Sequence, residues 1–189
     1  MTGEAPADRA AAAHGAPGEG GDSPAEIRAL AVTVSNRAAA AIYADRSGPV
    51  LAGLLAAAGC TVDGPLVVPD GAAVEAALRD AVAARYDVVV TTGGTGLTPG
   101  DLTPEMTRRV LDREIPGIAE AIRAAGVAGG VPAAMLSRGV AGLASGVLIV
   151  NLAGSTGGVK DGMAVLAPVL RHAVDQARGG DHPRPGVPH

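Results

Sequence analysis

Short apolar runs of strand length alternate with segments of helical period along most of the chain, and this alternation limits the possible folds more than any other feature. The runs lie at residues 30–34, 66–68, 87–90 and 147–150. An order of strand, helix and strand is typical of a mostly parallel sheet covered by helices. We therefore predict an α/β fold, with one domain over residues 27–178.

The segments between these runs carry helical signals. Residues 35–45 are expected to form a loop, and a helix should begin near Ser47 with Pro49 in its first turn. Further helices are expected over residues 74–82 and 118–125. The last helix is predicted to bury four residues of one face, Met163, Leu166, Leu170 and Val174.

The two ends of the chain differ from the middle in composition. Residues 1–26 are rich in Ala, Gly, Pro and acidic residues without periodicity, and residues 179–189 carry three Pro and three Gly. Segments of this kind bury too little apolar surface to offset the entropy of folding. Both ends are therefore predicted to be disordered tails.

Charge and aromatic content exclude two kinds of binding. The net charge is −4 and no basic run is present, which argues against nucleic acid as a partner, since proteins that bind the phosphate backbone need clustered Lys and Arg. The chain has no Phe or Trp, and Tyr43 and Tyr86 are its only aromatic residues. We therefore expect no aromatic stacking of a ligand.

The cysteine count and the hydropathy pattern indicate the compartment. Cys60 is the only cysteine, so no intrachain disulfide can form, and a reducing environment is the simplest interpretation. We expect Cys60 to serve in packing. No apolar stretch reaches the roughly 20 residues that a membrane span needs, and no signal peptide is recognised. The expected location is cytoplasmic, without a membrane partner.

Small, hydroxylic or ionisable residues directly follow the predicted strands. They occupy residues 35–37, 69–70, 92–101 and 151–156. In an open parallel sheet, ligands bind beyond the carboxyl ends of the strands, where loops and helix N-termini converge. The sequence therefore predicts a ligand site built from these four segments on one edge of the sheet.

The glycine-rich stretch 93–96 is the strongest single indication of the ligand. Glycine permits positive φ angles and close approach, so backbone N–H groups of such a loop can contact a phosphate. Thr103 is predicted to cap a helix that begins at Pro104 and adds its dipole. The stretch is not a Walker A loop, because no Gly-Lys-Ser/Thr follows it, and it is not a dinucleotide fingerprint, because Pro99 stands where the third Gly belongs. A tight strand-to-helix turn without a ligand explains the same glycines.

Two carboxylates, Asp70 and Asp101, each lie just beyond a predicted strand. There they would hold Mg²⁺, which in turn would hold phosphate oxygens. Asp70 equally fits the N-cap of the following helix, and Asp101 equally fits a residue that stabilises its loop. Arg37 is either a phosphate ligand or a solvated side chain, and the pair Ser137-Arg138 has the same two interpretations.

The order of these motifs resembles one known family. Thr-Thr-Gly-Gly-Thr-Gly from residue 91, Asp101, Thr103-Pro104 and Arg-Glu-Ile-Pro-Gly from residue 113 resemble the molybdopterin adenylyltransferase and molybdenum cofactor biosynthesis B-type proteins. Further segments agree in order, namely 34–37, 68–70, 135–138 and 151–154. The resemblance covers about residues 27–178.

The resemblance implies a three-layer α/β/α sandwich that assembles as a homotrimer. It also implies an activity, the Mg²⁺-dependent transfer of AMP from ATP to molybdopterin, with Asp70 and Asp101 as catalytic and metal-binding residues. The expected partners are molybdopterin, ATP and the molybdate-inserting enzyme of the same pathway. The residues expected to bind the substrates are Ser35, Arg37, Thr92, Gly93, Gly94, Thr95, Gly96, Ser137, Asn151, Gly154, Ser155 and Thr156.

Two positions depart from the family pattern, and two other functions compete with the first. Ala153 replaces a frequent Pro, which would make its loop less ordered. Asn36 replaces a frequent Asp, which would weaken Mg²⁺ binding if that charge contributed to it. The competing functions are a carrier that holds molybdopterin without turnover and a NAD-dependent oxidoreductase. The incomplete dinucleotide fingerprint counts against the oxidoreductase.

Overall fold

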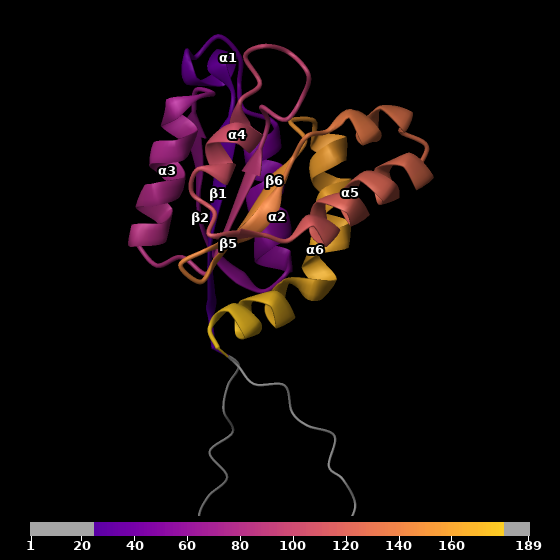
Figure 1. The fold of residues 1–189 in the computed structure, drawn as a ribbon. Coiled ribbons are helices and arrows are strands. Elements are labelled where there is room, and N and C mark those ends of the chain that lie inside the picture. Colours follow the sequence, from indigo (N-terminus) through magenta and orange to yellow (C-terminus); the bar gives the residue numbers. More distant parts are fainter. Residues whose placement is uncertain (1–24, 180–189) are drawn as a thin grey trace, which may run out of the picture.

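Six strands form one mixed sheet in the order β2-β1-β3-β6-β5-β4 in the computed structural model, which describes residues 25–179 (Figure 1). Four neighbouring strands are parallel, namely β2 (Cys60–Val68), β1 (Ile27–Val34), β3 (Val88–Thr92) and β6 (Val147–Leu152). The other two pair antiparallel, namely β5 (Ala141–Ala144) and β4 (Arg113–Glu114). The predicted α/β fold with a mostly parallel sheet is confirmed.

Helices cover both faces of this sheet. The face toward one core cluster carries α2 (Ser47–Ala57), α5 (Pro116–Ala128) and α6 (Thr156–Ala177). The opposite face carries α3 (Ala72–Ala83) and α4 (Thr103–Arg108). Two short helical segments complete the chain, α1 (Asn36–Ala39) and the 3₁₀ helix η1 (Pro132–Leu136). The arrangement is the three-layer sandwich that the family resemblance implies.

The uniform apolar character of β1 follows from this sandwich. Ala29 and Ala31 belong to the core cluster beneath α2 and α6, whereas Leu30 and Val32 belong to the cluster beneath α3 and α4. A parallel strand that is buried on both faces has a continuous apolar sequence because neither face is exposed to water. Cys60 lies in the first cluster, as expected for packing, and burial raises the pKa of its thiol.

The last helix packs against the sheet through one face of apolar side chains. Met163, Leu166, Leu170 and Val174 are all buried, which confirms the prediction for this face of α6. Because no Phe or Trp is available, these residues supply much of the volume between α6 and the sheet.

Truncation of Leu166 is expected to destabilise the fold strongly. Its side chain is 0% exposed, so Leu166→Ala should leave a cavity and lower the free energy of unfolding by about 2–5 kcal/mol. Val169→Ala, on the same helix with 45% exposure, is the matched control and should change that energy by less than about 1 kcal/mol. Urea unfolding measures both. Equal losses in the two variants would contradict the packing described here.

The second strand is longer than the sequence predicts. It begins at Cys60 instead of at residue 66. The apolar pattern misses its first half because β2 is an edge strand and exposes polar residues such as Asp63. Pro65, preceded by Gly64, interrupts the pattern within it, and the pairing with β1 shifts register at this point. Proline is tolerated at a sheet edge because its missing N–H costs no internal hydrogen bond there.

Two local predictions near the strand ends are wrong. The segment after β1 forms the short helix α1 before its loop, because the Ser35 hydroxyl accepts a hydrogen bond from Ala38 N at 3.1 Å and caps it. Thr103 does not cap α4, since the cap position is Leu102 and Thr103 is the first helical residue. The Thr103 side chain is buried and lies 3.5 Å from Asp70 Oδ1.

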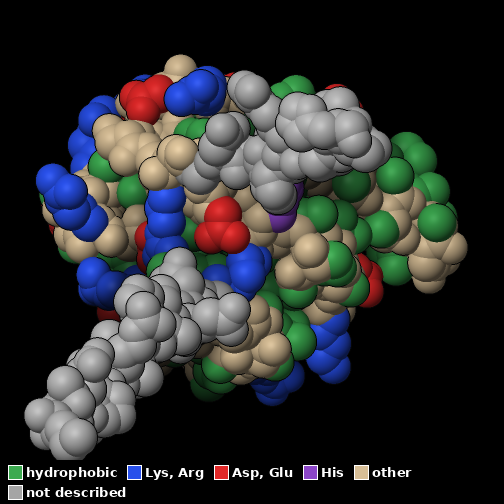
Figure 2. Space-filling model, turned by 90° about the horizontal axis from the view of Figure 1, so that it is seen from below, with side chains coloured by type: hydrophobic (Ala, Val, Ile, Leu, Met, Phe, Trp, Pro, Cys, Tyr) green, Lys and Arg blue, Asp and Glu red, His purple; other side chains and the backbone are tan. Residues whose placement is uncertain are grey.

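The opposite end of the sheet is held by ion pairs and one tyrosine. Arg178 contacts both carboxylate oxygens of Asp87, at 2.9 and 2.8 Å, while Tyr86 Oη donates to Asp63 at 2.6 Å and its ring packs under Arg28. The hydrogen bond to Asp63 raises the pKa of Tyr86. Figure 2 views this end of the molecule, where basic and acidic side chains are interspersed.

The predictions for the chain ends fall largely outside the described residues. Residues 1–24 and 180–189 are not described, so the two predicted tails stay predictions. Within residues 25–179, no helix is long and apolar enough to cross a membrane.

Candidate functional site

The four polar segments meet at the carboxyl edge of the parallel strands and form two adjoining cavities. The large cavity, of about 730 Å³, is lined by the glycine-rich loop, Ser137, the α5–η1 region and the start of α6. The small cavity, of about 390 Å³, is lined by the end of β1, Asp70 and the loop at 98–101. Gly94 and Asp101 line both cavities, so the two spaces meet at these residues.

Asp70 connects the loops that follow two strands. Its Oδ1 accepts hydrogen bonds from Gly71 N at 2.7 Å and Leu102 N at 3.1 Å. It does not cap α3, whose cap position is Gly71, so the capping interpretation is wrong. Burial raises the pKa of the Asp70 carboxyl, and the charge of Asp101 raises it further, although the backbone hydrogen bonds act in the opposite direction.

Asn36 has a structural contact that explains one departure from the family pattern. Its Oδ1 accepts a hydrogen bond from Asp70 N at 2.9 Å and thereby ties the loop after β1 to the loop after β2. A carboxylate oxygen would accept the same bond. The replacement of Asp by Asn therefore keeps this contact and removes only a negative charge next to the small cavity, which Asn36 also lines.

Asp101 closes its own loop and still faces both cavities. Its Oδ2 accepts from Thr98 N at 2.9 Å and from Thr98 Oγ1 at 2.6 Å. The loop-stabilising interpretation is therefore correct, and it is compatible with a catalytic role because the residue also lines both spaces. Gly96 packs against this carboxylate so closely that a Cβ there would lie 2.8 Å from Asp101 Oδ2.

Two glycines of the loop are required because other parts of the chain lie too close for a side chain, and not only because the loop turns. Gly93 has φ +106° and a Cβ there would lie 2.1 Å from the carbonyl oxygen of Val34. Gly94 has φ +63° and its Cβ would lie 2.1 Å from Asp70 Oδ2. The left-handed region disfavours other residues, and both positions lack space for a side chain. The loop therefore brings backbone atoms directly against β1 and the Asp70 carboxylate.

Ser35 and Arg37 line the small cavity, as the sequence predicts for site residues. Ser35 also caps α1, so its hydroxyl is used within the chain. The Arg37 guanidinium lies 5.8 Å from the centre of the Tyr43 ring, which is exposed. Tyr43 itself is not among the residues that line either cavity.

Thr95, Ser137, Gly154 and Ser155 line the large cavity together with Gly94 and Gly96. Ser155 caps α6 by accepting a hydrogen bond from Gly158 N at 3.0 Å. This 22-residue helix points its N-terminus at the cavity, and such an end favours an anion through its free N–H groups and its dipole.

Four predicted substrate-binding residues line neither cavity, namely Thr92, Gly93, Asn151 and Thr156. The Thr92 hydroxyl donates to Ala153 O at 2.8 Å. Asn151 is 4% exposed, and its side chain bonds Val140 N, Thr91 Oγ1 and Thr107 Oγ1 at 3.3, 3.0 and 3.0 Å. The structure therefore gives Thr92 and Asn151 supporting contacts beneath the loops.

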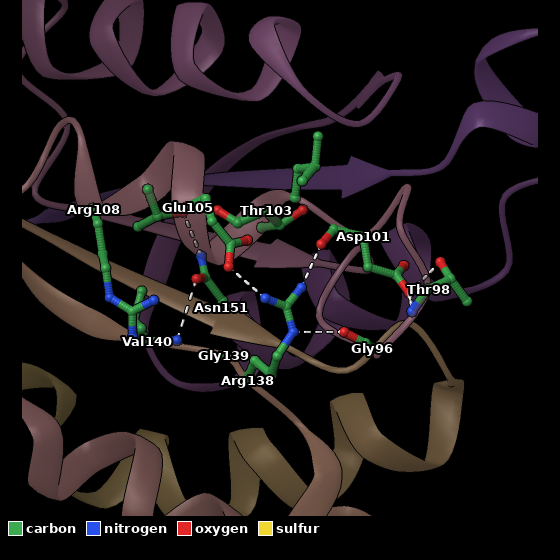
Figure 3. Close-up of polar contacts among 12 residues, drawn as sticks. Gly96, Thr98, Asp101, Thr103, Glu105, Arg108, Arg138, Gly139, Val140 and Asn151 are labelled. Atoms are coloured by element: carbon green, nitrogen blue, oxygen red, sulfur yellow. Dashed lines mark hydrogen bonds and ion pairs between the residues drawn. The ribbon is translucent and has the colours of Figure 1, made fainter.

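Two arginines outside the predicted substrate-binding set lie at or beside the large cavity. Arg123 of α5 lines the large cavity and donates to Ser137 O and Gly139 O at 3.4 and 3.2 Å. Arg138 contacts the glycine-rich loop and Asp101 (Figure 3). No motif marks Arg123, because it stands in the middle of a helix, whereas the sequence predicts Arg138 to be either a phosphate ligand or a solvated side chain.

The two carboxylates suit a magnesium ion that also binds water and substrate phosphates. They are too few for a metal ion held by protein ligands alone. Among residues 25–179, no group of three or more His, Cys, Asp or Glu could hold a metal. Asp70 and Asp101 nevertheless line the same small cavity. Mg²⁺ characteristically binds one or two carboxylates and completes its shell with water and substrate phosphates. The donor set present is therefore suitable for Mg²⁺ in the company of a phosphate ligand.

Asp70→Asn is expected to raise stability at neutral pH. The folded protein raises the pKa of this carboxyl, so its charged form disfavours folding above the ordinary carboxyl pKa, and this effect is lost below that pKa. The advantage of Asp70→Asn in urea unfolding should therefore be seen at pH 7 and shrink as the pH falls toward the ordinary carboxyl value. Asp80→Asn, at an exposed position on α3, is the control. A clear loss of stability at pH 7 in Asp70→Asn alone would disprove this account.

Taken together, the glycine-rich loop, the two carboxylates and the N-terminus of α6 give this edge of the sheet the features that α/β proteins use to bind phosphorylated ligands. Residues 30–172 match the family model described as "Probable molybdopterin binding domain". The chain belongs to this family, which confirms the resemblance seen in its motifs.

Solved and curated relatives agree with this assignment. The molybdopterin biosynthesis Mog protein from Mycobacterium ulcerans is 48% identical, with a TM-score of 0.77 over 82% of this chain and 99% of that chain. The molybdopterin adenylyltransferase of Pyrococcus furiosus is 33% identical over 83% of this chain and 95% of its own length. The molybdenum cofactor biosynthesis bifunctional protein of Synechococcus elongatus is 37% identical over 84% of this chain. The chain spans 50% of the length of that bifunctional relative.

Proposed function

We propose that this protein transfers the adenylyl group of ATP to molybdopterin. A terminal phosphate oxygen of molybdopterin attacks the α-phosphorus of ATP, the bond from that phosphorus to the bridging oxygen breaks, and pyrophosphate leaves. The observation that carries the proposal is that two cavities of different size meet at Gly94 and Asp101. An enzyme that joins two bulky phosphorylated substrates needs two such spaces with one point of contact.

The chemistry of the two cavities supports a division between the substrates. The large cavity offers hydroxyl groups of Thr95, Ser137 and Ser155 for the polar edge of a pterin, and the N-terminus of α6 for its phosphate. The small cavity offers Arg37 and the two carboxylates, which suit the phosphates of ATP and a metal ion. The reacting phosphates would then meet beside Asp101.

Magnesium is part of the proposal. Asp70 and Asp101 would hold it, and when bound it would offset the negative charge that gathers on the phosphates during transfer. The protein's own part is positional, because Gly94 allows the loop to lie against Asp70 while Asp101 stays fixed by Thr98. A homotrimer and an interaction with the molybdate-inserting enzyme, both implied by the family resemblance, stay predictions.

Product analysis tests the proposal. The purified protein is incubated with molybdopterin, ATP and Mg²⁺, and the products are separated and identified by mass spectrometry. Adenylated molybdopterin in an amount that exceeds the enzyme supports the proposal. Bound molybdopterin without any adenylated product would instead support the carrier function, and thermal stabilisation by NAD alone would support the oxidoreductase.

A further inference from the structure

The guanidinium of Arg138 lies between three parts of the site (Figure 3). Its Nε donates to Gly96 O at 2.7 Å, its Nη2 donates to Asp101 O, and its Nη1 pairs with Glu105 Oε1 on α4. The backbone of the same residue also donates from Arg138 N to Thr95 O at 3.0 Å. One residue thus bonds the glycine-rich loop, the loop that carries Asp101 and the following helix.

The two carbonyl groups that Arg138 holds stand at the two ends of one loop. These carbonyl groups belong to Gly96 and Asp101. Within the same loop, the Asp101 carboxylate accepts two hydrogen bonds from Thr98, which closes a turn. The residues between them, 97–100, are exposed and have no buried side chain to anchor them. The position of the Asp101 carboxylate therefore depends on the internal turn and on the two bonds from Arg138.

Within residues 25–179, the acidic partner of this arginine has only one of its two carboxylate oxygens satisfied. The side chains of Arg138 and Glu105 are partly buried, at 34% and 39% exposure. Glu105 Oε2 is buried and finds no hydrogen-bond partner within the described part of the chain. An unsatisfied carboxylate oxygen is costly, so the pair is held in place by something other than its own stability. Keeping the guanidinium in position for its two loop carbonyls accounts for this arrangement.

We propose that Arg138 is a positioning residue for adenylyl transfer, one that fixes the loop at 96–101 so that Asp101 stands where the two cavities meet. The inference rests on the proposed function, and it adds a residue that lines neither cavity and acts only through Asp101. Arg138 needs its planar group with several donors for this role, because lysine presents a single point charge.

Arg138→Lys tests the role with the charge retained. A displacement of Asp101 by about 1 Å should lower kcat by about 100-fold. KM for ATP and for molybdopterin should change by less than about threefold, because the residues lining the cavities keep their contacts. Arg108→Lys is the matched control, since Arg108 forms a more exposed pair with Glu114 at 2.8 Å, and it should retain kcat. A kcat within about twofold of the unaltered protein would overturn the proposal.

Hydrogen exchange provides a readout that does not depend on activity. In Arg138→Lys the amides of Thr98 and Asp101, both bonded inside the loop, should exchange faster, while amides of β3 should not change. Unchanged protection at Thr98 and Asp101 would overturn the proposal even if the protein made no adenylated product. Conversely, faster exchange in a protein that makes no such product would sustain the positioning of the loop while the proposed function failed.

A second variant is needed in case Arg138→Lys does not fold. Glu105→Gln removes the charge that holds the guanidinium but keeps an oxygen acceptor, on a residue that is partly exposed. It should lower kcat by about 10-fold with KM little changed, and raise exchange at the same two amides. A Glu105→Gln protein with unaltered kcat and unaltered exchange would overturn the inference.

Discussion

Asp101→Asn is expected to lower kcat for adenylyl transfer by roughly 10²–10³-fold while the fold stays intact. The amide keeps an oxygen that can accept from Thr98, so the loop is expected to hold its conformation. What it loses is the negative charge at the junction of the two cavities, and with it a metal-binding oxygen. Steady-state kinetics with saturating Mg²⁺, paired with thermal unfolding, measures the effect.

The control for this variant is an aspartate far from the site. Asp175→Asn lies at an exposed position on α6 and should leave kcat unchanged. If Asp101→Asn and Asp175→Asn had the same activity, the carboxylate of Asp101 would have no part in catalysis, and its contribution would be limited to the loop.

Gly94→Ala is expected to lower both stability and activity. The new Cβ would lie 2.1 Å from Asp70 Oδ2 and 2.2 Å from Thr103 Oγ1, so the Asp70 carboxylate must move. The φ of +63° adds strain for any residue with a Cβ, and strain of this kind costs about 1–3 kcal/mol. Because Asp70 is a proposed metal-binding residue, displacement by an ångström or more should lower kcat by about 100-fold. Thermal unfolding and kinetics of the same preparation check both effects.

Gly53→Ala, on α2, is the control. A Cβ at Gly53 meets no atom within 4 Å of the described structure, its φ is not in the left-handed region, and the residue lines neither cavity. Neither stability nor kcat should fall below that of the unaltered protein. If Gly94→Ala behaved like Gly53→Ala, then Gly94 would not be required by the close approach of Asp70.

The fold could be predicted where local pattern and burial agree. The run at 30–34 is buried on both faces and is therefore apolar throughout, which makes it recognisable as a strand. The first half of β2 could not be found in this way, because an edge strand exposes alternate residues and Pro65 breaks its apolar run. The length of an edge strand is set by pairing with its neighbour, here β1, and a propensity pattern does not contain that information.

The location of the candidate site could be predicted from the sequence, but the contacts that each of its residues makes could not. Asp70, Asp101 and the glycines were found because polar residues that follow parallel strands must share one edge of the sheet. Asn151 stands at such a strand end too, yet it is buried and bonds Thr91 and Thr107. Whether a side chain at a strand end turns outward or inward depends on the helix packed above it, and this is set by tertiary packing.

The close approaches within the site also lay beyond the sequence. Threonine is a residue type that often caps helices, which is why the sequence predicts this role for Thr103. In the fold its hydroxyl lies close to Gly94 and near Asp70. Arg138 appeared as one of two ambiguous residues before a short strand, whereas its three contacts reach residues between 33 and 42 positions away. Contacts over such separations arise only when the loops come together at the edge of the sheet.

The central claim is that the α-phosphorus of ATP becomes attached to molybdopterin. The most direct measurement uses two preparations of ATP, one labelled at the α-phosphorus and one at the γ-phosphorus, each incubated with the protein, molybdopterin and Mg²⁺. We predict that the α label appears with the pterin and the γ label appears in pyrophosphate. Recovery of the γ label on the pterin, or of neither label while molybdopterin stays bound, would contradict adenylyl transfer.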